Sequence, residues 1–247
     1  MNYITSESNA KVSPQVYART GGVLYLAIFV LSALSMWLQS ALVVSNDPAA
    51  TAHNILASQT QWRISSVAEL IMFGCDVPLA AILFVLLRPV SEGLALASAL
   101  FRFAEAVIGS AAVLLHVAPL ALLSGAAYLG ALDPRQLQAS ALFSIHLYNY
   151  AFGIALIPFG VHCAILGYLI FRSTYLPKTL GVLLALAGVC YVANSFALIA
   201  APSVANVTFL AMLVTGLPAE LGLCIWLLAV GLNVARWNAM TLARSGV

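Results

Sequence analysis

Charged side chains occur inside long apolar stretches of this 247-residue sequence, where a charge needs a chemical reason to be present. They are Glu69, Asp76, Arg102, Glu105 and Glu220. A charge at the centre of a bilayer costs about 2.5–3.5 kcal/mol on insertion scales. One arginine cannot neutralise four carboxylates, so at least one carboxyl is expected to be protonated or to contact water. Two alternatives remain: a polar cavity for protons or small molecules, or an ion-pair network that holds helices together.

The depth of these groups can be counted along helices. From a predicted turn near residue 90, Asp76 and Arg102 lie roughly 21 and 18 Å away at 1.5 Å per residue. Because a guanidinium cannot lose its proton, we predict that Arg102 pairs with Asp76. Glu105 and Glu220 reach a similar depth, so these four are the expected lining of a cavity. Three further polar candidates for the same region are Glu69, His162 and Asn194.

One stretch carries its polar residues at helical spacing. Arg102, Glu105, Gly109, Ala112 and His116 follow one another at intervals of three and four. Residues at this spacing lie on one face of a helix. We therefore expect a single polar stripe that faces the protein interior.

Two histidines suggest a different chemistry. His116 and His146 lie at equal distances before and after a predicted turn near residue 131, so continuous antiparallel helices would place them side by side. Such a pair could hold a metal or b-type haem, or relay protons. The simpler alternative is two hydrogen-bonded histidines with no cofactor, and this is what we expect. The sequence has no H-E-x-x-H, G-x-S-x-G or P-loop motif, so no motif supports a particular enzymatic reaction. Whether the protein is an enzyme stays open at this point.

The composition identifies the elements that must position these residues. Of the chain, 63% is hydrophobic and 7% charged, against about 25% charged in soluble domains. We predict an all-α integral membrane bundle of about six transmembrane helices in one domain, residues 21–235. The apolar segments are 21–44, 65–87, 93–132, 137–171, 180–201 and 207–234.

The third and fourth segments are longer than a bilayer needs. Residues 93–131 would form a helix of roughly 58 Å, against a hydrocarbon core of about 30 Å. We expect each long helix to break or kink at a proline, Pro119 in one and Pro158 in the other. The alternative is a long hairpin, closed near Asp133, that projects beyond the bilayer.

Basic residues predict the orientation. An excess of Lys and Arg marks cytoplasmic loops. Residues 1–20 and 236–247 are therefore expected to be cytoplasmic, and loop 45–63 to lie outside, where Asp47 and Pro48 open a short helix ending near Ser58. The expected inner side holds Lys11, Arg19, Arg88, Arg172, Lys178, Arg236 and Arg244, and the outer side Arg63 and Arg135.

Short similarities within the chain suggest a duplication. Ala68-Glu69-Leu70 recurs as Ala219-Glu220-Leu221, and each follows a helix that contains Gly-Val-Leu. Helices one and two would then be parallel copies of helices five and six.

Several longer motifs resemble a known family. They are Ala18–Leu26, Cys75-Asp76 with Phe84–Val90, Leu123–Leu129, His162–Leu169 and Tyr175–Leu183. In this order, across residues 15–235, the chain resembles the bacterial membrane proteins filed under domain of unknown function 4386. The resemblance implies a multi-pass protein of the bacterial inner membrane, and it implies no reaction.

The function predicted from these patterns is small-molecule or proton-coupled binding or transport through an intramembrane polar cavity, with a small lipophilic or protonatable molecule as the expected ligand. The alternatives are a membrane redox or metal protein and a structural or partner-binding subunit. Membrane lipid is the expected environment. With a net charge of +2 and no basic run, nucleic acid is not an expected partner.

Overall fold

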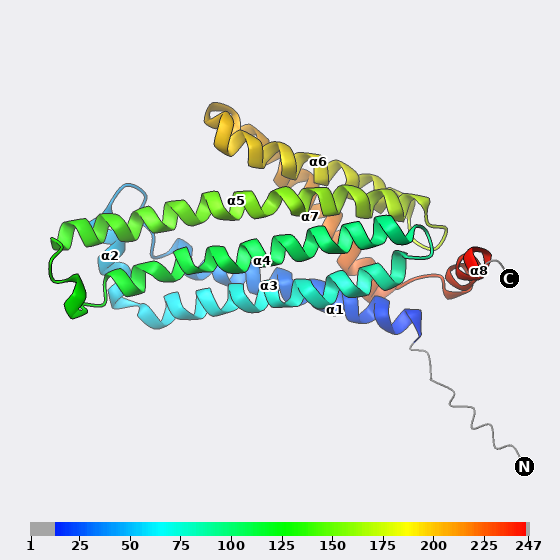
Figure 1. Cartoon of the computed structure of the whole chain (residues 1–247), viewed down its shortest axis with the longest axis horizontal. Helices are drawn as coiled ribbons and strands as arrows, with labels where there is room; N and C mark the ends of the chain where they lie inside the picture. Colours follow the sequence, from blue (N-terminus) through cyan, green and yellow to red (C-terminus); the bar gives the residue numbers. More distant parts are fainter. Residues whose placement is uncertain (1–12, 246–247) are drawn as a thin grey trace, which may run out of the picture.

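The computed structural model describes residues 13–245, which form a bundle of long helices with no strand in that range. Figure 1 shows the long helices running side by side, with α8 at the end of the bundle where the chain begins. The helices are α1 (Pro14–Ser40), α2 (Pro48–Ala57), α3 (Gln59–Leu87), α4 (Glu92–Leu122), α5 (Pro134–Arg172), α6 (Lys178–Ala200), α7 (Ala205–Ala229) and α8 (Val234–Ser245), with 3-10 turns at Ala127–Leu129 and Pro202–Val204.

Six of these helices are long and apolar enough to cross a membrane: α1, α3, α4, α5, α6, and α7 with the turn that precedes it. Their outward faces carry exposed aliphatic side chains such as Val30, Leu114 and Val189. Such a surface is stable only where lipid replaces water. This confirms the prediction of an all-α, multi-pass membrane bundle of about six spans.

The six spans close into a ring. Each packs against two neighbours, in the order α1, α3, α4, α5, α6, α7 and back to α1. The closing contact joins the first and last spans, where Gly22 of α1 lies against Leu228 near the end of α7. The ring therefore has an interior, bounded by all six helices.

The short helix predicted to begin at Asp47 and Pro48 is confirmed as α2, and its position on the outer side stays a prediction. The Asp47 carboxylate caps it by accepting a hydrogen bond from the Ala50 N–H at 2.9 Å, and Pro48 occupies the first turn. Two boundaries differ from the prediction. Arg63 lies within α3 and not in the predicted loop. A helical position suits this residue, because its side chain is exposed and long enough to reach the interface between membrane and water. The first span, α1, begins at Pro14 rather than at residue 21. Lys11 lies outside the described residues.

The long helices are largely continuous. α5 runs unbroken through Pro158 for 39 residues, and α4 ends at Leu122, three residues after Pro119. At 1.5 Å per residue, α5 is roughly 58 Å long. This length supports the alternative prediction, a long hairpin that projects beyond the bilayer core. Asp133 caps α5 in a capping box with Gln136. No break occurs at Pro158, because packing on both flanks supports the helix; a kink at either proline stays a prediction.

α5 and α6 pack closely through glycines. Gly160 and Gly167 of α5 lie opposite Gly188 and Gly181 of α6, and a Cβ added at any of them would lie under 3.0 Å from the facing backbone. Small residues of this kind allow membrane helices to approach each other. The contact holds α6 against the rest of the ring.

The final helix, α8, is an element that was not predicted from the sequence. Residues 236–247 were expected to form a tail, yet α8 occupies them up to Ser245. Gly231 makes it possible: its φ of 76° ends α7, and its N–H donates to the Trp226 carbonyl at 2.8 Å. Asn233 then caps α8 by accepting from the Arg236 N–H at 3.1 Å.

Candidate functional site

The interior of the ring contains a cavity of about 220 Å³. Its lining includes Asp76, Arg102, Glu105 and Glu220, the four residues expected to surround one. The other lining residues are mostly apolar or aromatic: Ile28, Phe29, Ser32, Met72, Phe152, Leu156, Phe159, Tyr191, Met212, Leu213 and Leu217. Every one of the six spans contributes to the wall. The site is thus a small apolar chamber with ionisable groups in it.

Arg102 contacts three other polar side chains at the cavity. Its side chain is only 1% exposed, and its Nη2 lies 2.5 Å from Oδ1 of Asp76. Nη1 lies 3.2 Å from the Tyr25 hydroxyl and 3.2 Å from Nε2 of His162. The guanidinium also lies over the rings of Tyr25 and Phe159, at 4.9 and 5.4 Å. The predicted pair of Asp76 and Arg102 is confirmed.

His162 supports Arg102 as a neutral group. Arginine has only donors, so Nε2 of His162 must accept in their hydrogen bond. The proton of the imidazole therefore sits on Nδ1, which lies 2.9 Å from the Ser98 carbonyl oxygen. The Ser98 hydroxyl is also 2.9 Å from Nδ1. This arrangement orients Arg102 without adding charge to the cavity.

The two remaining carboxyls of the cavity differ in their partners. Glu220 accepts a hydrogen bond of 2.5 Å from the Tyr191 hydroxyl. Glu105 makes no hydrogen bond within residues 13–245, and its Oε2 is buried without a partner. The Nε of Arg102 is likewise buried and unpartnered. The cavity thus contains three carboxyls, one guanidinium and two polar atoms with unmet hydrogen bonds.

Glu69 was expected in the same group, and the structure places it in a second cluster. Its Oε2 lies 2.8 Å from Nδ1 of His116, and its Oε1 accepts from Ser35 at 2.9 Å and from Gln39 at 2.7 Å. Glu69 and Asp76 share a face of α3, but seven residues separate them by roughly 10 Å along the axis. The predicted set of acids is therefore divided between two sites.

The predicted pairing of His116 with His146 is wrong. His116 is 2% exposed and packs edge-on against Trp62, with ring centroids 4.6 Å apart. Its neighbour on α5 is Tyr148, at 5.3 Å, while His146 is exposed. Two residues correspond to about 200° of rotation around a helix, so the side chain two positions before Tyr148 faces away. Across the described range, no three His, Cys, Asp or Glu side chains gather to hold a metal ion.

The predicted stripe on α4 is confirmed, because every member of it is buried. Asn194 lies beside the cavity rather than in its lining. Its Oδ1 accepts from the Thr208 hydroxyl at 3.1 Å, and its Nδ2 lies 3.5 Å from the Met212 sulfur. Asn194 therefore links α6 to α7 by hydrogen bonds, next to Met212 of the cavity wall.

Two tyrosines of the site were missed from the sequence. Tyr25 and Tyr191 both occur well inside apolar helices rather than at their ends. A hydroxyl at that depth needs a hydrogen-bond partner, because lipid offers none. Position within the span was thus a usable signal that distinguishes these residues from interfacial aromatics.

The cavity reaches the lipid-facing surface between α1 and α7. Its lining includes Leu213 and Leu217 of α7, which are 45% and 44% exposed, and the exposed Ser32 of α1. Ser32 follows Gly22 in α1, and Leu213 and Leu217 precede Leu228 in α7, so all three lie beyond the close approach of Gly22 to Leu228, toward the opposite end of the bundle. A molecule dissolved in the bilayer would meet the cavity here.

Comparison with known proteins finds relatives of unassigned activity. The chain is 30% identical over 129 residues to an uncharacterized protein of Archaeoglobus fulgidus. That match covers 52% of this chain and 63% of the relative, less than two thirds of its length. No solved structure matches the chain. A family model described as a domain of unknown function, DUF4386, matches residues 20–231, from α1 to the glycine that ends α7. This multi-pass membrane chain therefore belongs to the DUF4386 family.

Proposed function

We propose that this protein binds a small, partly apolar molecule with a cationic group in its intramembrane cavity, and that binding is coupled to the release of protons. The observation that carries the proposal is the excess of acid. Three carboxyls share an apolar chamber with one guanidinium, and Glu105 has a buried oxygen with no partner. An excess of buried acid makes a poor packing device, because each unpaired charge is costly.

The arrangement of charges assigns roles. Arg102 is engaged by Asp76, and Glu220 accepts from Tyr191. Glu105 is left as the group for an incoming cation. In the empty cavity, protons on Glu105 and Glu220 would balance the charge. A bound ammonium group would replace one of those protons, so ligand and proton compete for the same carboxyl.

The walls favour an aromatic or branched amine of modest size. A volume of about 220 Å³ lies below the usual range of about 300–1,000 Å³ for ligand pockets, so the ligand is small. Phe29, Phe152 and Phe159 are among the lining residues, and their ring faces attract cations. The opening between α1 and α7 supports entry from the bilayer. Transport would follow if the cavity also opened to one aqueous side.

A matched pair of probes tests this proposal. 2-Phenylethylamine and 2-phenylethanol have the same shape, and only the amine carries a charge. We expect the amine to raise the thermal midpoint of the purified protein and to release protons into a weakly buffered solution, and the alcohol to do neither. Glu105→Gln should abolish both effects, while the exposed Glu92→Gln should retain them. Equal shifts with amine and alcohol would point to the walls alone, and an unchanged response in Glu105→Gln would remove Glu105 from the site.

A further inference from the structure

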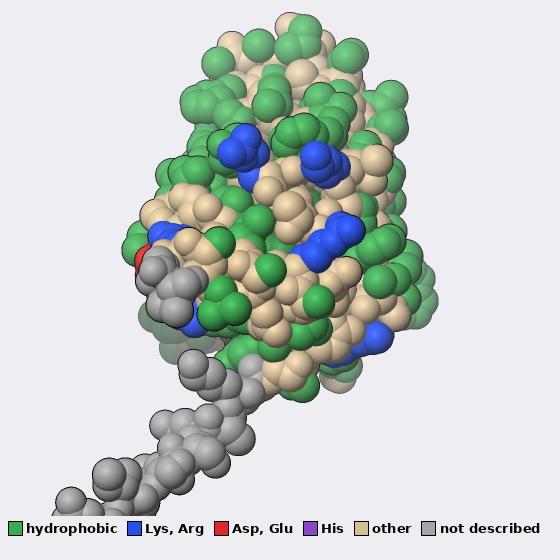
Figure 2. Space-filling view, turned by 90° about the vertical axis from the view of Figure 1, so that its right-hand side faces the viewer, with side chains coloured by type: hydrophobic (Ala, Val, Ile, Leu, Met, Phe, Trp, Pro, Cys, Tyr) green, Lys and Arg blue, Asp and Glu red, His purple; other side chains and the backbone are tan. Residues whose placement is uncertain are grey.

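The end of the bundle that carries both described chain termini is strongly basic. Six exposed basic residues lie at this end, and Glu92 is the one acidic residue there within residues 13–245. Figure 2 shows this face with several blue groups and a single small red area. The six are Arg19, Arg88, Arg172, Lys178, Arg236 and Arg244. At the opposite end Arg63 and Arg135 are balanced by Asp47 and Asp133, so the charge is concentrated on one side.

α8 is held across this basic end by specific contacts. The Trp237 indole N–H donates to the Leu86 carbonyl at 2.9 Å, and Arg236 donates to the Thr174 carbonyl at 3.0 Å. Trp237 and Met240 pack against the main hydrophobic core. Figure 1 shows α8 nearly end-on, so it crosses the ends of the long helices. A helix placed in this way lies along a membrane interface.

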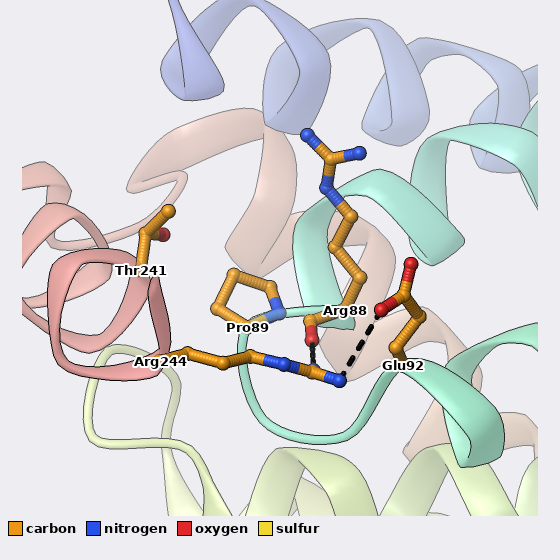
Figure 3. Close-up of a pocket in the computed structure, with 5 residues that line it drawn as sticks. All are labelled: Arg88, Pro89, Glu92, Thr241 and Arg244. Atoms are coloured by element: carbon orange, nitrogen blue, oxygen red, sulfur yellow. Dashed lines mark hydrogen bonds and ion pairs between the residues drawn. The ribbon is translucent and has the colours of Figure 1, made fainter. Parts of the chain in front are cut away.

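Two adjoining hollows lie beside the contacts of α8 with the bundle, and Arg88 and Thr241 line both. The smaller, of about 290 Å³, is lined by Arg88, Pro89, Glu92, Thr241 and Arg244. In it Arg244 donates to the Arg88 carbonyl and lies 3.3 Å from a carboxylate oxygen of Glu92 (Figure 3). Glu92 therefore neutralises Arg244. The larger hollow, of about 750 Å³, is lined by Pro14, Tyr17, Val85, Arg88, Trp237, Asn238, Thr241 and Leu242.

The Arg88 guanidinium is the charge in these hollows that has no counterion. It makes no side-chain hydrogen bond or ion pair within the described range of the chain. Figure 3 shows it pointing away from the pair of Arg244 and Glu92, toward the ribbon of α1. The larger hollow lies on that side, because its lining includes Pro14 and Tyr17 of α1. The Arg88 cation, the amide donor of Asn238 and apolar walls thus meet in one concave site.

We propose that the larger hollow binds the headgroup of an anionic phospholipid, with the phosphate on Arg88. Arginine binds phosphate through two parallel N–H donors, and basic pockets beside membrane spans select anionic headgroups. The Asn238 amide can donate to the headgroup oxygens, whereas the Thr241 hydroxyl already donates to the Trp237 carbonyl at 2.9 Å. Tyr17, Val85 and Trp237 form the apolar part of the wall, which suits the glycerol and the first acyl carbons. A free phosphate would leave that apolar surface unused, so the lipid is the better fit.

The test uses the full-length protein in neutral detergent with defined lipids. Phosphatidylglycerol is added in one arm, phosphatidylcholine with the same acyl chains in a second, and inorganic phosphate in a third. We expect phosphatidylglycerol alone to raise the thermal midpoint and to persist as a bound lipid in native mass spectra. Arg88→Gln should weaken phosphatidylglycerol binding roughly fivefold or more, the effect of one guanidinium at a lipid surface. The matched control is Arg135→Gln at the opposite end, which should bind normally.

Three outcomes would overturn the proposal. One is a shift with phosphatidylcholine equal to that with phosphatidylglycerol. Another is a shift with inorganic phosphate alone, which would indicate a site for soluble anions. The third is normal phosphatidylglycerol binding by Arg88→Gln. If Arg88→Gln does not fold, Thr241→Glu decides, because a carboxylate in the hollow should repel the headgroup while the guanidinium remains; unchanged binding by Thr241→Glu would then refute the proposal.

Discussion

Arg102 connects four helices through one guanidinium. It projects from α4 and reaches Asp76 on α3, Tyr25 on α1 and His162 on α5. The guanidinium cannot lose its proton, so Asp76, Tyr25 and His162 all contact a permanent positive charge. The residue therefore sets both the stability of the ring and the electrostatics of the cavity.

Removal of either member of the buried pair should destabilise the protein. We expect Asp76→Ala and Arg102→Ala each to cost about 3–5 kcal/mol, because the surviving charge is left uncompensated. The double variant should recover part of the combined loss. Thermal unfolding in detergent, followed by circular dichroism, measures all three. Losses that simply add would mean that the two side chains do not interact in the folded protein.

The same isosteric change should lower the stability of the protein at one acidic residue and leave it almost unchanged at another. Glu69 has three side-chain partners, so Glu69→Gln should lower stability by about 1–3 kcal/mol. Glu105 makes no hydrogen bond, so Glu105→Gln in the empty protein should stay within about 0.5 kcal/mol of the parent. Both variants would be compared at one pH without added ligand. A large loss in Glu105→Gln would favour the packing-network alternative for the cavity.

The contact of α5 with α6 depends on glycine at the scale of the element. A Cβ at position 167 would lie 2.5 Å from the Ala185 nitrogen and the Gly181 oxygen, which are backbone atoms. We therefore expect Gly167→Ala to lower the free energy of unfolding by about 1–3 kcal/mol, the usual cost of overpacking.

Gly74→Ala is the control for this substitution. Gly74 also lies in a helix, and a Cβ there meets nothing within 4 Å. Alanine is the better helix former, so Gly74→Ala should be neutral or stabilising by up to about 1 kcal/mol. Parallel denaturation curves compare the two. Similar losses at both positions would show that the close contact with α6 does not govern the effect.

Local chemistry decided some elements and long-range contacts decided others. α2 follows from Asp47 and Pro48, because an N-cap and a first-turn proline act within one turn of the chain. α8 has a comparable cap at Asn233, but it is held by carbonyls of residues 86 and 174. Those partners are distant in sequence, so the sequence of residues 236–247 alone could not show that α8 packs against the end of the bundle.

The charge asymmetry of the whole molecule predicts its orientation. Placement in a bacterial inner membrane with both termini in the cytoplasm stays a prediction, supported by the basic end of Figure 2. Reporter fusions at Met1 and Val247 should both give cytoplasmic signals. A reporter inserted near Gly130, at the opposite end of the bundle, should give a periplasmic one. Signals of opposite type from the two termini would contradict an even number of spans.

The sequence by itself determined the class of the protein, its span count and the pair of Asp76 with Arg102. The high apolar content indicates that lipid surrounds the protein, and the lengths of the apolar segments give the number of membrane spans. Neither inference requires knowledge of how the helices pack. Asp76 and Arg102 were predictable because a short turn joins their helices, so counting residues from it gives both depths. The proposed duplication rests on the sequence alone and stays a prediction.

Only the tertiary structure decided which faces meet. It closed the ring with α1 against α7, separated Glu69 from the cavity, and turned His146 outward. The physical reason is the geometry of the helix. Depth changes by only 1.5 Å per residue, while the direction of a side chain changes by about 100°. An error of two residues in a long hairpin therefore barely alters depth but reverses the face, and only packing between distant segments corrects it.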